Sequence, residues 1–148
     1  RNLFVAGFIG SPKMNVVEAT LLAATAERAQ VRLADGSELA LAVDATRAAP
    51  GAPVRYGIRP EHVELGRAGE PDTLPASVAF VEQLGSSTQL YAELPGMDEP
   101  FACQLDGRVR PRRGDAVALR CPADAGYLFD ADGLAFQRRL PPAERQAA

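Results

Sequence analysis

Residues 77–94 read SVAFVEQLGSSTQLYAEL, and this stretch decides the fold class. Two runs, Ser77 to Leu84 and Gln89 to Leu94, have the β-branched and aromatic content of strands. Between them lies Gly85-Ser86-Ser87, which predicts a hairpin turn or a bulged loop. The stretch therefore predicts two antiparallel strands.

The same pattern of short strands separated by turns extends along the rest of the chain. Turn signals recur at short intervals, among them Asp35-Gly36, Pro50-Gly51, Pro95-Gly96, Asp106-Gly107 and Asp132-Gly133. Apolar residues alternate with polar ones between the turns, as in Val31-Arg32-Leu33, which is typical of strands with one buried face. The alanine-rich run from Ala19 to Ala29 is also expected to be strand. We predict an all-β fold of one or two small barrels, because closure removes exposed strand edges.

Both ends of the chain differ from this pattern. Leu3, Phe4, Gly7 and Phe8 recur at helical spacing before Gly10-Ser11-Pro12, which predicts a short N-terminal helix within residues 1–13. Residues 141–148 lack apolar periodicity and are expected to be disordered. The β-domain is expected over residues 14–140, with a sub-boundary near residues 66–75, and the whole sequence is expected to be part of a longer chain.

Composition excludes several classes of protein. The chain has 148 residues, 47% hydrophobic and 24% charged, which matches a soluble globular domain. Its net charge of −3 argues against a main role in binding nucleic acid. The cysteines, Cys103 and Cys121, occupy core-like strand positions, so we expect buried structural thiols in a reducing compartment.

Catalytic signatures are missing from the sequence. The one lysine, Lys13, follows Pro12, so no Gly-Lys pair of a nucleotide-binding phosphate loop exists. His62 is the only histidine, and no Gly-x-Ser-x-Gly motif accompanies it. We expect a chain without catalytic, metal or cofactor-binding residues, and a hydrolase based on His62 is the weakest alternative.

Two segments place polar residues at chain reversals. In Tyr56-Gly57-Ile58-Arg59-Pro60-Glu61-His62, the proline ends a strand and restricts the preceding arginine to extended backbone. In Val81-Glu82-Gln83-Leu84-Gly85-Ser86-Ser87-Thr88, a carboxylate precedes a turn rich in hydroxyl groups. Each segment is explained equally well by a structural turn and by an interface or ligand role.

These segments, together with Phe4 to Asn15 (FVAGFIGSPKMN), resemble the C-terminal regulatory region of ATP-binding-cassette importer ATPases. The similarity is to the carbohydrate branch, which imports maltose, related sugars and glycerol-3-phosphate. It implies a pair of OB-like barrels of the transport-associated (TOBE) type, joined to a nucleotide-binding domain. It also implies that the parent protein binds ATP and magnesium and lies on the cytoplasmic face of the bacterial inner membrane.

The resemblance implies a non-catalytic regulatory and dimerisation domain. The implied partners are its own nucleotide-binding domain, a second copy of the subunit, the membrane subunits and a cytoplasmic regulatory protein. The expected interface residues are Gly57, Arg59, Pro60, Glu61, His62, Glu82, Gly85, Ser86, Ser87 and Thr88, and Phe4 and Phe8 are expected to contact the ATPase domain.

The alternative is a sensor of a small ligand, an oxyanion or a sugar phosphate. Related barrels bind molybdate through backbone amides and hydroxyl groups. In this sequence Ser86, Ser87 and Thr88, assisted by Arg59, are the candidates for such a site.

Overall fold

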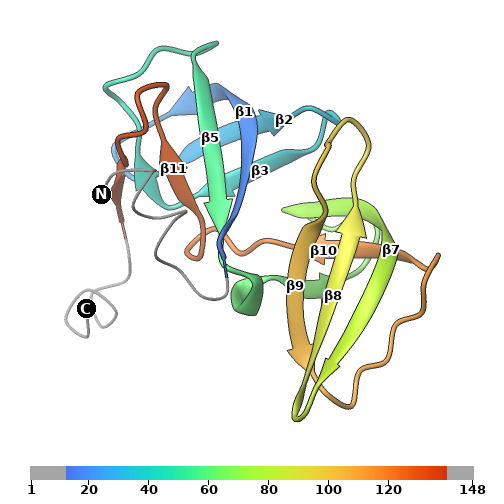
Figure 1. The fold of residues 1–148 in the computed structure, drawn as a ribbon. Coiled ribbons are helices and arrows are strands. Elements are labelled where there is room, and N and C mark those ends of the chain that lie inside the picture. Colours follow the sequence, from blue (N-terminus) through green and yellow to red (C-terminus); the bar gives the residue numbers. More distant parts are fainter. Residues whose placement is uncertain (1–12, 140–148) are drawn as a thin grey trace.

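Two antiparallel sheets of five strands each form most of the described part of the chain, residues 13–139, in this computed structural model (Figure 1). The first sheet has the order β11-β5-β1-β2-β3. Its strands are β1 (Asn15–Ala24), β2 (Ala29–Leu33), β3 (Glu38–Leu41), β5 (Pro53–Ile58) and β11 (Tyr127–Phe129).

The second sheet has the order β6-β10-β7-β8-β9. Its strands are β6 (Glu64–Gly66), β7 (Thr73–Leu84), β8 (Ser87–Glu93), β9 (Phe101–Asp106) and β10 (Ala116–Arg120). A short ribbon pairs β4 (Val43–Asp44) with β12 (Gln137–Arg138), and a single 3-10 turn, η1 (Pro60–His62), connects the two large sheets. The prediction of an all-β, OB-like fold is confirmed.

The hairpin predicted from residues 77–94 is β7 and β8. Its turn consists of Gly85 and Ser86, and Gly85 has a φ of +64°, the conformation that a type II′ turn requires at its first central residue. β7 begins at Thr73, four residues before the predicted start. The added residues pair with β10 rather than with β8, from Thr73 opposite Arg120 to Ala76 opposite Val117. This partner lies far along the chain, so local sequence did not indicate the extension.

Alternating burial accounts for the strands of the first sheet. In β2 the side chains of Ala29, Val31 and Leu33 are buried and the intervening ones are not. The predicted strand from Ala19 to Ala29 is two strands, β1 and β2. They are separated by a turn in which the Thr25 hydroxyl accepts hydrogen bonds from two backbone N–H groups.

One hydrophobic core extends through both sheets. Leu39 and Leu41 from the first sheet and Leu90 and Leu119 from the second are fully buried in the same cluster. Apolar burial of this kind is the main stabilising contribution to folding.

The chain passes from the first sheet to the second at η1, between β5 and β6, and returns to the first sheet between β10 and β11. The segment 66–75, predicted as a sub-boundary, connects β6 and β7 within the second sheet, and a domain boundary there stays a prediction. The predicted helix in residues 1–13, with Phe4 and Phe8, and the predicted tail 141–148 fall outside the described residues, apart from Lys13. Within residues 13–139, no helix has the length and apolar character needed to cross a membrane.

Candidate regulatory surface

The segment from Gly57 to His62 forms a rigid corner at the end of β5. Arg59 has φ −76° and ψ 144°, the extended backbone expected before proline. The backbone N–H of His62 donates a hydrogen bond of 3.0 Å to the carbonyl of Arg59, which closes the turn. Pro60 is buried, whereas Glu61 and His62 are exposed. The corner therefore presents charged and polar side chains from a fixed backbone.

Gly57 has a packing role within this corner. A Cβ atom added at this position lies 2.7 Å from the Sδ atom of Met14 and 3.3 Å from Cε2 of Phe129. The absence of a side chain allows these two buried residues to pack directly on β5. An additional interface role for Gly57 stays a prediction.

The second motif occupies the end of the β7–β8 hairpin. Glu82, Gly85 and Ser86 are exposed. Ser87 donates a hydrogen bond of 3.4 Å from its hydroxyl to the Leu84 carbonyl. Thr88 is fully buried and donates from its hydroxyl to the Gln83 amide oxygen at 3.5 Å. The hydroxyl groups of Ser87 and Thr88 thus both bond within the hairpin.

The two motifs lie on separate parts of the surface. Figure 1 shows η1 at the junction of the sheets and the β7–β8 turn at the outer end of the second sheet. No hydrogen bond or salt bridge among residues 13–139 connects them. Arg59 therefore does not join Ser86 and Ser87 in one polar cluster, and an oxyanion site at the hydroxyl groups of the hairpin stays a prediction.

The outer face of the β7–β8 hairpin carries exposed apolar side chains that were not among the site residues predicted from the sequence. Phe80 and Leu84 each have a relative exposure of 49%, and they flank Glu82 on β7. The Phe80 ring stacks on Tyr91 of β8, with ring centroids 4.3 Å apart and an interplanar angle of 17°. Exposed apolar groups beside a charged one are typical of an interaction surface.

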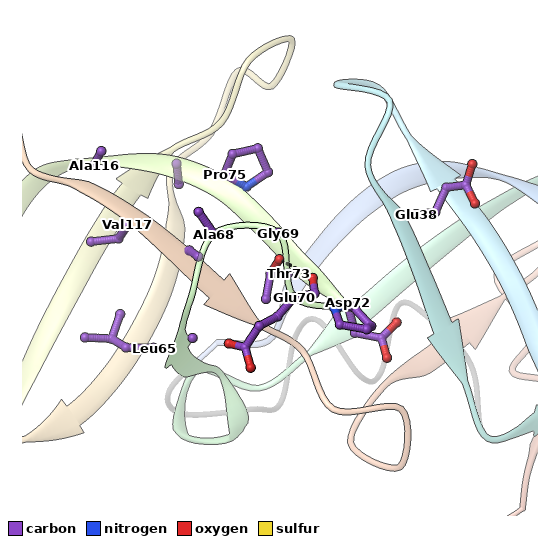
Figure 2. A pocket seen from close by; sticks show the side chains of 14 residues that line it. Glu38, Leu65, Ala68, Gly69, Glu70, Asp72, Thr73, Pro75, Ala116 and Val117 are labelled. Carbon is purple, nitrogen blue, oxygen red and sulfur yellow. Dashed lines mark hydrogen bonds between the residues drawn. The ribbon is translucent and has the colours of Figure 1, made fainter.

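A groove of about 670 Å³ lies between the two sheets beside the segment 66–75 (Figure 2). Figure 2 shows Glu38 on one side of it and Glu70, Asp72 and the residues of the second sheet on the other. Each carboxylate already has a partner. Glu38 pairs with Arg32, Glu70 accepts from the backbone N–H of residue 67, and Asp72 accepts from the backbone N–H of residue 40 at 2.8 Å. These bonds give the three acids structural roles.

Among residues 13–139, the two thiols are buried and the acidic side chains do not gather into a metal-binding cluster. Burial raises the pKa of both thiols, Cys103 and Cys121, to about 12, so at neutral pH they are protonated and unreactive. Both were predicted to be buried structural thiols, and their burial is confirmed. Within the part of the chain that the structure describes, no group of three or more His, Cys, Asp or Glu side chains is placed to hold a metal ion.

An ion pair fixes the segment after β11. Arg47 donates to the Asp130 carboxylate at 2.5 Å, and the same carboxylate accepts from the backbone N–H groups of Asp132 and Leu134. The hydrogen bond from Arg47, followed by those from the backbone, holds the pKa of Asp130 below its usual value. The guanidinium also lies 4.0 Å from the centroid of the Phe136 ring.

The arrangement defines a class: a small β-barrel module with polar corners. Comparison with protein families identifies it further. Residues 56–129 match the TOBE domain family, and residues 10–63 match the MalK OB fold domain. The chain belongs to the TOBE domain family.

Curated relatives match almost the whole chain. It is 36% identical over 138 residues to the maltose/maltodextrin import ATP-binding protein MalK of Vibrio cholerae. The MalK proteins of Photobacterium profundum and Vibrio parahaemolyticus are 37% and 39% identical. Each match covers 93% of this chain but only 37% of the relative. The chain thus spans little more than a third of the length of these proteins.

A solved structure supports the fold. The cytoplasmic molybdate-binding protein ModG, with molybdate bound, superposes with a TM-score of 0.66 over 81% of this chain and 95% of its own. The two sequences are only 17% identical, so this likeness concerns the fold alone.

Proposed function

We propose that this chain is the non-catalytic regulatory and dimerisation module of the ATP-binding subunit of a bacterial sugar importer. The observation that carries the proposal is the similarity to MalK proteins over 93% of the chain, with the OB and TOBE families matched in order along it. The parent subunit would bind ATP and magnesium through its nucleotide-binding domain. It would associate with membrane subunits at the cytoplasmic face of the inner membrane.

The proposed mechanism is tethering. Two regulatory modules in contact keep two ATPase subunits at high effective concentration while their nucleotide-binding domains separate after hydrolysis. Two features support this role: the rigid corner that carries Arg59 and Glu61, and the outer hairpin face on which Phe80 and Leu84 flank Glu82. Apolar groups would supply affinity, and the charges would orient the partners.

Sedimentation equilibrium of the chain and of charge-reversal variants tests this proposal. We expect concentration-dependent dimers that Arg59→Glu or Glu82→Arg weakens. Glu27→Arg serves as a matched control, because Glu27 is exposed on the β1–β2 turn, far from both motifs (Figure 1). A chain that remains monomeric at high micromolar concentration, or a dimer equally insensitive to all three reversals, would contradict the proposed interface.

A further inference from the structure

A second groove, of about 570 Å³, lies where the start of β1 meets the outer face of β8 and β9. Val16 and Val17 form one wall, and Ala102 belongs to the other. The Asn15 side chain fixes the distance between these walls, because its amide donates to the Ala102 carbonyl and accepts from the Ala102 N–H, both at 2.8 Å. The volume is within the range of small-molecule sites.

Gln89 is one of the residues that line this groove. Its side chain is only 6% exposed, yet its amide forms no hydrogen bond with any residue in 13–139. Glu82 and Gln104 lie opposite it on the neighbouring strands, and neither side chain is hydrogen-bonded to its side-chain amide. Because Gln89 is one of the residues that line the groove, a molecule in the groove can reach its side chain. An amide that lines a groove can exchange hydrogen bonds with water or with a ligand there.

An aromatic ring lies next to this amide on the same face of β8. Tyr91 lines the groove, and its stacking on Phe80 holds the ring in place. The groove also carries one group of each charge, Lys13 and Glu99, and both are exposed. The lining thus combines an aromatic surface, an amide that both donates and accepts, and no net charge.

We propose that this groove binds a neutral polyhydroxy compound, a sugar or a polyol. A sugar hydroxyl both donates and accepts, as the Gln89 amide does, and the C–H face of a sugar ring is apolar enough to pack on Tyr91. The opposite charges of Lys13 and Glu99 favour a neutral ligand over an anion. The inference goes beyond the tethering role, which requires no ligand.

Titration of the ¹⁵N-labelled chain, followed by NMR, tests the proposal. Maltose and glycerol serve as neutral probes, and glycerol-3-phosphate and inorganic phosphate as anionic ones. We expect saturable shifts of the Gln89 side-chain amide and the Tyr91 backbone amide with at least one neutral probe. Gln89→Met, which keeps the shape but removes the amide, should weaken that binding by about tenfold or more. Gln104→Met, on the neighbouring strand and outside the groove, should not.

A second measurement separates lost binding from lost folding. Without ligand, Gln89→Met should unfold at a temperature close to that of the wild type, because methionine has a similar length and the change removes no hydrogen bond within residues 13–139. If Gln89→Met does not fold, Tyr91→Leu takes its place and should weaken binding by a similar factor. The proposal is overturned if neither neutral probe binds, if the anions bind more tightly, or if the folded variant binds as the wild type does. Since dimerisation is measured separately, none of these outcomes decides the tethering proposal.

Discussion

Asn15 provides the sharpest test of how the two sheets are joined. Its side-chain amide exchanges two hydrogen bonds of 2.8 Å with the backbone of Ala102, so that β1 of the first sheet is bonded to the edge strand of the second. Asn15→Ala removes both bonds and leaves the N–H and C=O of Ala102 without these partners. At about 0.5–1.5 kcal/mol for each bond, we expect the free energy of unfolding to fall by about 1–3 kcal/mol.

Urea denaturation measures this loss directly, and thermal unfolding should show a decrease of about 2–4 °C for each kcal/mol in a chain of this size. Gln30→Ala is the matched control, because the Gln30 amide bonds only to an exposed carboxylate, that of Glu38, at 3.2 Å. Its effect should remain within about 0.5 kcal/mol. Equal urea midpoints for Asn15→Ala and Gln30→Ala would refute the assigned role of Asn15.

The variant Asn15→Asp tests the hydrogen bond that the Asn15 amide donates to the Ala102 carbonyl. An ionised carboxylate still accepts from the Ala102 N–H but repels the Ala102 carbonyl, whereas a protonated one donates to it. The folded-state pKa of the new acid should therefore lie above its unfolded value of about 3.9. Its stability relative to wild type should be highest below that unfolded value and should fall as pH rises through the folded pKa. A stability difference that does not change with pH would contradict this reasoning.

Two further predictions concern the ionisable groups. Cys103 and Cys121, whose pKa values burial raises to about 12, should react with a thiol reagent at pH ~8 at least about a hundredfold more slowly in the native chain than in concentrated urea; equal rates would show that they are accessible. The pKa of Asp130 is lowered in the folded state, chiefly by Arg47. The stabilisation by this ion pair should therefore be present above the unfolded-state pKa of about 3.9 and be lost as pH falls through the folded-state pKa. The free energies of unfolding of the wild type and of Arg47→Met should then become equal in acid. A difference that persists at the lowest pH would assign the effect of Arg47 to its contact with Phe136 instead.

Local sequence predicted the elements that short-range physics determines. The β7–β8 hairpin follows from Gly85 and its flanking strands, and the extended backbone of Arg59 follows from Pro60. Sequence did not predict pairings between distant segments, such as Tyr127 of β11 with Gly57 of β5. Such pairings depend on the shape of the whole core rather than on any local pattern.

The candidate surfaces were predicted less completely for the same reason. Thr88 belongs to a segment rich in hydroxyl groups that suggested an accessible site, but the strand buries it. The sequence did not predict Gln89 and Tyr91 as site residues. The groove beside them forms where residues 13–17, more than seventy positions earlier, lie against β8 and β9. The bulge between Val78 and Phe80, which places Phe80 opposite Tyr91, has no evident local signal either.

The start of β1 connects the features on which the proposals depend. Met14 fills the space that Gly57 leaves free beneath the polar corner, and Asn15 bonds to the edge strand of the second sheet. Val16 and Val17 then form a wall of the second groove. Because these residues are consecutive, a displacement of this strand disturbs the packing at the corner, the junction of the sheets and the shape of the groove together. Residues 14–17 therefore contribute to both candidate surfaces, the one proposed to bind a second copy and the one proposed to bind a ligand.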